Sequence, residues 1–251
     1  MHNKNCKLNV ALPKQGELFE KCDKIQNVMQ LLSKHSYITG FEKESEKRQM
    51  KYDNWHLSKG MKFTSTNDIP TVNAYNGQIP NRLTRFNELS HCYFDSYVHF
   101  FLHDYVFNCL WSRLEFYTLA IAKYRGVIAP DYSMFVNVSK QVNIQSLYRN
   151  NFISSFWQNI GISVVPSVTW GNADSFDYCL EGKPKHSVLA IGSVGMSWCA
   201  ASIELFKFGI SQVIQKLEPT ALLIYGNKIA FDNQEIPVYY YEDFINSKFR
   251  K

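Results

Sequence analysis

Short apolar runs rich in β-branched residues alternate with helical segments over most of residues 97–242. The alternation predicts five strands and a candidate for a sixth, at 97–105, 126–133, 162–170, 187–194, 221–226 and 236–242. Between them it predicts a helix that ends near Tyr124 and helices at 139–160, 174–180 and 203–217. Strands and helices that alternate over short connections build βαβ units and a mainly parallel sheet. The predicted strands are apolar almost throughout, as expected for strands that are covered on both faces.

The number of strands limits the kind of sheet that the chain can build. Five or six strands are too few for a complete eight-stranded barrel. The sequence therefore predicts an α/β fold with a mainly parallel sheet of five to six strands and flanking helices, either open or a partial barrel. A chain of 251 residues, 45% of them hydrophobic, can bury a sizeable core.

The first 65 residues follow a different pattern. Residues 17–34 predict an amphipathic helix, because apolar side chains recur at steps of four and three: Leu18, Cys22, Ile25, Met29 and Leu32. We expect this helix to dock on the main domain, with a protein partner as the alternative. Residues 41–51 hold seven charged side chains and predict an exposed helix or a linker. We place a domain boundary near residue 65, between an N-terminal helical, charged extension (1–65) and an α/β domain (66–251).

Cysteine spacing and the lack of long apolar segments bear on the compartment. The six cysteines form no CxxC pair, so we expect no zinc ribbon, thioredoxin-type site or disulfide framework. The chain opens without the apolar stretch of a signal peptide. Its longest charge-free run, 187–203, is too short and too polar to span a bilayer. The sequence therefore predicts a soluble, cytoplasmic protein without a membrane anchor.

The net charge of +5 is distributed unevenly along the chain. The first 90 residues carry 14 Lys and Arg against 9 Asp and Glu, whereas the remaining residues carry 13 of each. Electrostatic attraction to nucleic acid would therefore come from the N-terminal third. The alternative is an ordinary solvated surface of mixed sign.

Polar and aromatic residues follow every predicted strand, whereas the opposite strand ends are blander. Ligands of parallel α/β proteins collect outside the carboxyl ends of the strands, so these residues predict a binding site at one edge of the sheet. The candidates are His103, Asp104, Asp131, Tyr132, Trp170, Asn172, Asp174, Ser193, Trp198 and Asn227. Arg149, in the predicted helix 139–160, is a further candidate as an anion-binding fork.

Most of these residues also have a structural interpretation. Asp174 could cap a short helix, and Asp131 could form a turn after Pro130. Trp170 could belong to the core, and His103 could be a buried, hydrogen-bonded histidine. Arg149 could be a solvated helix charge. Their coincidence at one edge favours a site over a set of unrelated structural roles.

Familiar catalytic and nucleotide-binding motifs are missing. The sequence has no GxxxxGK[ST], GxGxxG, GxSxG or HExxH, so it supports no standard phosphate cradle, esterase elbow or zinc protease and names no cofactor. His99 and His103 lie four residues apart, which on a strand would place both on the same face. A metal held by His103, Asp104 and Asp131 is conceivable, but we assign no metal site.

Five segments between residues 68 and 226 resemble a family found in bacteria, phages and mobile elements, catalogued as domain of unknown function 4417. They are "IPTVNAYNGQIPNRLTRFNE", "VHFFLHDYVFNCLW", "GVIAPDYS", "YRNNFISSFWQNIGISVVPSVTWGNADSFDYCLEGKPKHSVLAIGSVG" and "LEPTALLIYG". The resemblance implies a compact α/β domain with recurring residues at Asp131, Arg149, Asn150, Trp170 and Gly195, and it implies no particular reaction. This chain departs from the family pattern at His103, where an aspartate is frequent, and at Met196, where a cysteine commonly follows the glycine. Both departures count against a catalytic role for these two positions.

Three functions fit the predicted site. In the leading hypothesis, an enzyme-like domain of a phage or mobile element acts on a nucleotide or nucleic acid. Asp131 is then the general base or a metal ligand, Arg149 clamps an anion, and Trp170 is a partly exposed stacking wall within reach of Asp131. One alternative is a binding protein without catalysis, and another is a sugar-processing hydrolase that pairs Asp131 with Asp174.

Overall fold

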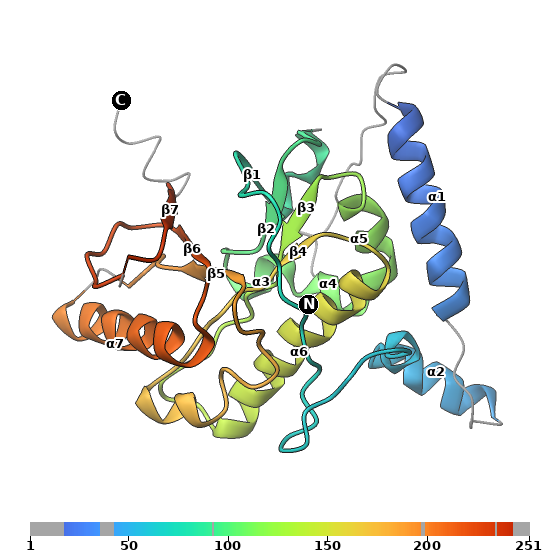
Figure 1. Ribbon diagram of the computed structural model, residues 1–251. Helices are drawn as coiled ribbons and strands as arrows, with labels where there is room; N and C mark the ends of the chain where they lie inside the picture. The colour runs from blue at the N-terminus through green and yellow to red at the C-terminus, as the bar shows by residue number, and fades with distance from the viewer. Residues whose placement is uncertain (1–17, 36–42, 92, 197–198, 234, 243–251) are drawn as a thin grey trace.

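The protein folds around seven parallel strands that follow one another in space in chain order (Figure 1). This computed structural model describes residues 18–35, 43–91, 93–196, 199–233 and 235–242. Two sheets are formed, with strand orders β1-β2-β3-β4 and β5-β6-β7. The strands are β1 (Leu83–Arg85), β2 (Tyr97–His99), β3 (Gly126–Ile128), β4 (Val164–Val165), β5 (Val188–Gly192), β6 (Ala221–Tyr225) and β7 (Val238–Tyr241).

A parallel bridge joins the two sheets just beyond the short strand β4. Ser167 pairs with Ala190 of β5. The amide of Val168 donates to the Ala190 carbonyl (2.9 Å), and the Ala190 amide donates to the Pro166 carbonyl (2.8 Å). The backbone hydrogen bonding therefore continues from β1 to β7. The predicted parallel direction of the strands at 126, 162, 187 and 221 is confirmed.

The sheet is strongly curled. The ring of Tyr225 at the end of β6 lies 4.3 Å from the ring of His99 at the end of β2, between centroids. Four strand spacings of ~4.8 Å would separate these strands by about 19 Å in a flat sheet. The Tyr241 hydroxyl of β7 also donates to the carbonyl of Pro80, just before β1 (2.6 Å). The concave face is therefore closed over a small apolar cluster, which includes Tyr97, Ile128, Val165, Val188 and Leu223.

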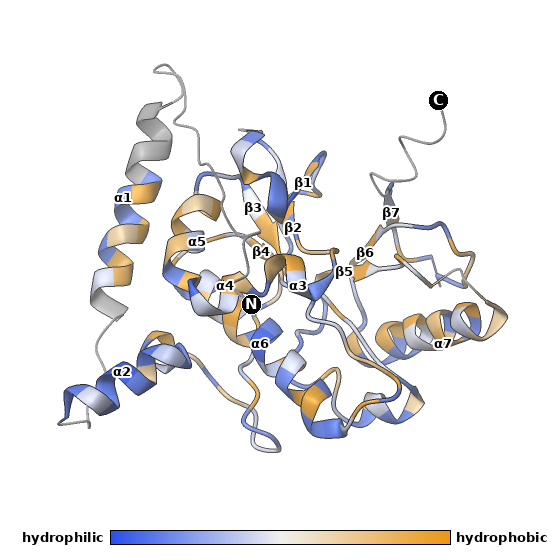
Figure 2. Ribbon diagram, turned by 180° about the vertical axis from the view of Figure 1, so that it is seen from behind, coloured by the Kyte–Doolittle hydropathy of each residue, from blue (hydrophilic) through white to orange (hydrophobic). Residues whose placement is uncertain are grey.

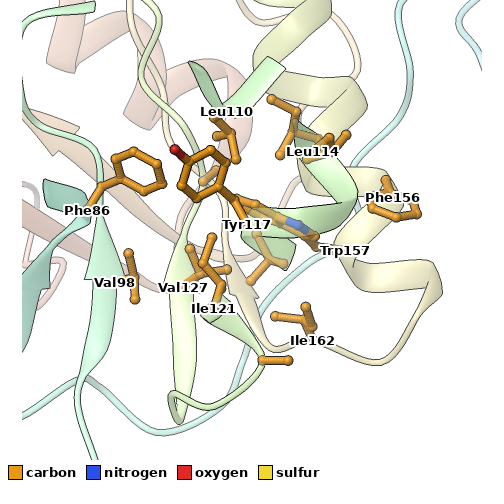
Figure 3. Packing of buried hydrophobic residues seen from close by; sticks show 14 of the residues in the cluster. Phe86, Val98, Leu110, Leu114, Tyr117, Ile121, Val127, Phe156, Trp157 and Ile162 are labelled. Atoms are coloured by element: carbon orange, nitrogen blue, oxygen red, sulfur yellow. The ribbon is translucent and has the colours of Figure 1, made fainter. Parts of the chain in front are cut away.

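Helices cover the convex face and bury its apolar side chains. The helices that contribute buried side chains are α1 (Leu18–His35), α3 (Asp104–Phe107), α4 (Cys109–Ser112), α5 (Leu114–Ile121), α6 (Lys140–Asn159) and α7 (Ala200–Leu217), whereas α2 (Glu44–Tyr52) contributes none. Over β2 and β3, Val98 and Val127 pack with Ile121 of α5 and Trp157 of α6 (Figure 3). Over β5 and β6, a second cluster packs against α7. The convex face is thus divided between two groups of helices, one on each sheet (Figure 1).

Several predicted element boundaries were wrong. The strand predicted at 97–105 ends at His99, because the Leu102 amide turns back to the Phe100 carbonyl (2.6 Å) and α3 begins at Asp104. Strand β1 was not predicted, so the sheet has seven strands rather than five or six. The short helix predicted at 174–180 is a 3₁₀ helix, η3 (Ala173–Asp177). His99 and His103 do not share a face, since His99 is buried in the sheet and His103 is exposed before α3.

The N-terminal helix packs on the domain, and the face that it buries matches the predicted stripe only in part, since Leu32 is buried and Ile25 half-buried but Met29 is not. Val28 and Leu32 are buried in the main cluster, whereas Met29 is 53% exposed. Lys24 also donates its Nζ to the Tyr124 carbonyl (2.9 Å). The side chains of Leu18 and Cys22 lie outside the described residues. Helix α2 buries none of its residues and is mostly hydrophilic, as predicted (Figure 2).

Thiols and membrane spans were also part of the sequence prediction. The cysteines whose side chains are described, Cys109, Cys179 and Cys199, are free thiols. In the part of the chain that the structure describes, every helix is too short or too polar to cross a bilayer.

Candidate functional site

Asp131 follows β3 at the carboxyl edge of the sheet and lies against Gly192, the last residue of β5. A Cβ atom built on Gly192 would lie 3.4 Å from Asp131 Oδ2 and 2.9 Å from the ring of Phe101. The missing side chain therefore gives the carboxyl group room beside the strand. Asp131 Oδ1 is buried and has no hydrogen-bond partner among the described residues. A buried polar atom without a partner is costly, which makes Asp131 the most unusual group at this edge.

Burial and neighbouring charges set the protonation of Asp131. Burial, and after it the charge of the Asp104 carboxylate, raise the pKa of Asp131 while the Lys183 ammonium lowers it, and together they bring this pKa to about 7. Burial likewise lowers the pKa of Lys183 to about 8, against the charges of Asp131 and Cys179. Asp131 is thus protonated about half of the time near neutral pH. A group with such a pKa can both give and take a proton.

Asp104 fixes the loop that carries Asp131. Both of its carboxylate oxygens accept from the Ser133 amide, at 3.2 and 3.1 Å, and Oδ1 also accepts from the Ser133 hydroxyl at 2.9 Å. Burial raises the pKa of Asp104, while these hydrogen bonds and the nearby His103 and Arg149 lower it. The loop is therefore tied to α3 through one carboxylate.

Asn150 of α6 holds the same loop from the other side. Its Oδ1 accepts from the Tyr132 amide (2.8 Å) and its Nδ2 donates to the Tyr132 carbonyl (3.2 Å). Asn150 is fully buried, so this pair of bonds replaces a backbone partner that the loop lacks. Asp131 is thereby held between two anchored neighbours.

Arg149, one residue earlier on α6, projects between two aromatic rings. Its guanidinium carbon lies 5.2 Å from the centroid of Trp111 and 5.7 Å from that of Tyr132, within the range of a cation–π contact. Arg149 is half-buried and makes no hydrogen bond or ion pair with any residue that the structure describes. The rings orient the guanidinium and leave its N–H groups available for an anion.

The concave face adds a second group of residues that the sequence did not single out. His99 is 1% exposed, its Nδ1 accepts from the Phe101 amide (3.3 Å), and its ring packs against Tyr225. Burial, and after it the charge of Arg85, lower the pKa of His99 to about 3. His99 is therefore neutral, and because Nδ1 accepts a hydrogen bond from the Phe101 amide, the proton of the ring is on Nε2. It can serve only as a hydrogen-bond donor at that atom.

Sequence reasoning missed His99, Arg85, Lys183 and Tyr225 for identifiable reasons. Arg85 ends the short strand β1, which lies in a turn-rich segment, and His99 lay inside a strand predicted to continue to residue 105. Lys183 precedes β5 by several residues, where no strand-end argument applies. A period of two from Tyr97 would have placed His99 on the concave face.

Trp170 is not at this site. It was predicted to be partly exposed and within reach of Asp131, which is wrong: it is 6% exposed and packs on the convex side of the sheet. Its ring lies 5.9 Å from both Phe176 and Phe206, and a Cβ atom on Gly209 of α7 would lie 2.1 Å from its Cε2. Gly209 thus opens a slot in α7 that receives the indole. The predicted strand 162–170 is therefore shorter than expected, since β4 is Val164–Val165, and Trp170 lies beyond β4 with its side chain in this slot.

The polar residues after Trp170 have structural contacts. Asn172 caps η3, since its Oδ1 accepts from the Ser175 amide (3.2 Å). Asp174 is exposed and accepts from Asn172 Nδ2 (3.3 Å). The carboxylate whose charge acts on Asp131 is Asp104. The structure therefore provides no pairing of Asp131 with Asp174.

The remaining candidates make structural contacts, are exposed, or lie outside the described residues. The Ser193 hydroxyl donates to the carbonyls of Tyr225 (3.2 Å) and Asn227 (2.7 Å), so it ties β5 to the end of β6. His103 is exposed, against the alternative of a buried histidine, and stacks on Tyr105. Trp198 lies outside the described residues.

Metal ligands and enclosed space add little to the site. Among the side chains that the structure describes, no three His, Cys, Asp or Glu groups converge as metal ligands. A shallow hollow of about 390 Å³ lies elsewhere, over the N-terminal half of α6. It is lined by Asn67, Ile69, Gln141, Val142, Ile144, Gln145 and Tyr148. None of the predicted site residues lines this hollow.

The profile of the family "Domain of unknown function (DUF4417)" matches residues 61–242. The "Gene 1 protein" of Mycobacterium phage L5 is 34% identical over 140 residues, which cover 56% of this chain and 61% of the phage protein. The "Gene 1 protein" of Mycobacterium phage D29 is 27% identical over 191 residues, 74% of this chain and 70% of that protein. No solved structure matches this chain.

Proposed function

This chain belongs to the family "Domain of unknown function (DUF4417)", with similar proteins in mycobacteriophages, and we propose that it is an enzyme-like domain acting on a nucleotide or nucleic acid. The proposed site lies at the carboxyl ends of β2, β3 and β5. Asp131 is its proton donor and acceptor, and Arg149 is its anion clamp.

The Asp131 carboxyl group carries this proposal. It is held beside Gly192 with one oxygen unpaired and buried, and its pKa is about 7. A carboxyl group with an ordinary pKa is a weak general base and is almost never protonated at neutral pH. Burial next to Asp104 changes both properties, which suits a reaction that moves one proton at neutral pH. His99 adds a neutral Nε2–H donor on the concave face.

Arg149 supports the choice of a phosphate-bearing substrate. A guanidinium presents its donors in a planar fork that matches the oxygens of a phosphate group. The rings of Trp111 and Tyr132 hold this fork in place without using its N–H groups. Trp170 has no part in the proposal, because its ring is buried under α7.

The test compares Asp131→Asn with the wild type and with Asp174→Asn as a matched control. Each protein is incubated with ribonucleotides, deoxynucleotides and short single-stranded oligonucleotides, and products are followed by mass spectrometry. We expect turnover by the wild type and by Asp174→Asn, and a loss of about 10²- to 10⁴-fold in Asp131→Asn, the range of general acid–base catalysis. Nucleotide binding without turnover by any of the three would favour a binding protein instead. Equal turnover in Asp131→Asn would exclude the proposed role of this carboxyl group.

A further inference from the structure

Two aromatic rings stack on the surface next to the proposed site. His103 and Tyr105 flank the start of α3, with ring centroids 5.5 Å apart and planes 10° from parallel. Tyr105 is 72% exposed and His103 is exposed as well. Rings in this position bury little apolar surface, so the core does not explain them. An open, stacked ring pair is the arrangement that proteins use as a platform for an unpaired base.

The ring pair lies close to the free guanidinium of Arg149. Asp104, which stands between the two rings in the chain, accepts from the Ser133 hydroxyl, and the Arg149 guanidinium carbon lies 5.7 Å from the ring centroid of Tyr132, the residue before Ser133. Both oxygens of Asp104 accept from the Ser133 amide, and Asp104 forms no ion pair within 4.0 Å of Arg149 among the described residues. The aromatic ring pair and the guanidinium of Arg149 are therefore connected through the same loop, Tyr132 and Ser133, after β3.

We propose that the His103–Tyr105 ring pair and Arg149 bind one nucleotide of a single-stranded nucleic acid. The base stacks on the open face of Tyr105, and a backbone phosphate accepts from the Arg149 guanidinium. A base can stack on a side chain only when it is free of its own partner, so the site selects single strands over duplexes. The inference rests on the proposed function and names the substrate class of that site.

Asp104 makes the proposal more specific. Its carboxylate stands beside the position of the bound phosphate and repels it, so binding should be moderate and should weaken with salt. Asp104→Asn removes this repulsion and keeps an oxygen that can accept from Ser133. The proposal therefore predicts that Asp104→Asn binds a single-stranded oligonucleotide more tightly than the wild type does. A substitution that only perturbed the local structure would weaken binding.

The experiment measures fluorescence anisotropy of a labelled ten-nucleotide oligothymidylate with the full chain at low salt. We expect Tyr105→Ala to weaken binding by about 5- to 150-fold, the range for loss of one stacked base. Arg149→Gln should weaken binding by about tenfold, Arg149→Lys should restore it only in part, and Asp104→Asn should strengthen it. Tyr239→Ala and Lys59→Gln, exposed residues elsewhere, are the matched controls for a lost ring and a lost charge.

Each variant and each nucleic acid has one outcome that would contradict the proposal. Tyr105 is so exposed that Tyr105→Ala leaves the fold intact, and wild-type affinity in this variant would reject the platform. Equal affinity for the oligothymidylate and for a duplex of the same length would reject the single-strand preference. Asp131→Asn separates the two proposals, because it should bind like the wild type and fail only in turnover. Single-strand binding that depends on Tyr105 and Arg149, without turnover, would leave this inference standing and contradict the enzymatic function.

Discussion

At the level of single residues, the carboxyl edge of the sheet contains a destabilising group, the buried and unpaired Oδ1 atom of Asp131. A buried carboxyl oxygen without a hydrogen bond costs folding free energy, and most proteins pair or expose it. Asp131 is instead held there by neighbours that are themselves well bonded, Asn150 through Tyr132 and Asp104 through Ser133. An unfavourable polar group that is held in place by well-bonded neighbours is typical of functional sites.

The raised pKa of Asp131 predicts a pH dependence of stability. The folded state holds the proton up to about pH 7, whereas the unfolded chain releases it near 3.8, the ordinary value. The folded state therefore disfavours the charged form, and its stability falls as the pH rises between these two values. From pH 5 to 7.5 the loss should be on the order of 2–3 kcal/mol, at 1.36 kcal/mol per unit of pKa.

Asp131→Asn isolates this contribution, because the amide keeps the shape and does not titrate. Urea unfolding of both proteins at pH 5 and 7.5 measures the difference in the free energy of unfolding. We expect the free energy of unfolding of Asp131→Asn, relative to that of the wild type, to be higher at pH 7.5 than at pH 5 by that amount. Lys183 titrates in the folded state near pH 8 and so acts mainly above this window. Parallel pH profiles for the two proteins would show that the carboxyl group is not perturbed.

The sequence could predict which residues follow the strands, but not to which face of the sheet each side chain points. The sequence placed Asp131 and Asp104 at one edge and Arg149 on a helix, and in the structure the charge of Asp104 acts on Asp131 while that of Arg149 acts on Asp104. Trp170 had the same signal yet turns to the opposite face, because the partner that receives it, Gly209, lies 39 positions further along the chain. A contact of that range leaves no local pattern in either segment.

At the level of elements, the apolar runs predicted most of the strands, but the predicted strands extend beyond the observed ones. The apolar run after β2 continues through Phe100 and Phe101, although the backbone has already turned at His99. Hydrophobicity records burial, and both phenylalanines are buried without being part of a strand. The opposite error applies to β1, whose three residues are too few to show a period. Boundaries depend on backbone hydrogen bonds, which side-chain periodicity reports only indirectly.

The packing of α7 on the sheet predicts the effect of Gly209→Ala. A Cβ atom there would lie 2.1 Å from the Trp170 ring, closer than any normal contact, so the indole or the helix must shift. Alanine favours a helix over glycine by about 1 kcal/mol, but overpacking a core costs about 1–3 kcal/mol. We expect net destabilisation in thermal unfolding, with oligonucleotide binding unchanged.

Gln215→Ala, on an exposed position of the same helix, is the control for helix propensity and should leave the melting temperature nearly unchanged. A Gly209→Ala variant that melts above the wild type would mean that the indole slot is not needed. Trp170 would then have to be free to move, and its burial would require another explanation.

At the level of the whole molecule, the curl of the sheet creates the concave face and its buried polar groups. The sequence left an open sheet and a partial barrel as alternatives. The contact between His99 and Tyr225 and the bond from Tyr241 to Pro80 require a curled sheet. Neither contact could be predicted, because each joins elements that are separated by more than 100 residues. Curling depends on how all strands twist together, which no single segment encodes.

The boundary near residue 65 stays a prediction, and a chain that begins at residue 66 tests it. That chain lacks Val28, Leu32 and Leu57, which are buried in the main cluster. Burying each such side chain contributes about 1.5–3 kcal/mol, so their loss removes about 5–9 kcal/mol, comparable with the whole stability of a typical domain. The shortened chain should therefore melt at least about 10 °C below the full chain, or lose its cooperative transition, in differential scanning calorimetry. A chain that begins at residue 18 keeps all three side chains and is the control for the loss of residues 1–17 alone. If the chain that begins at residue 66 melts at the same temperature as the full chain, the α/β domain is stable without its N-terminal helices. The apolar surface that these helices cover would then contribute nothing to its stability.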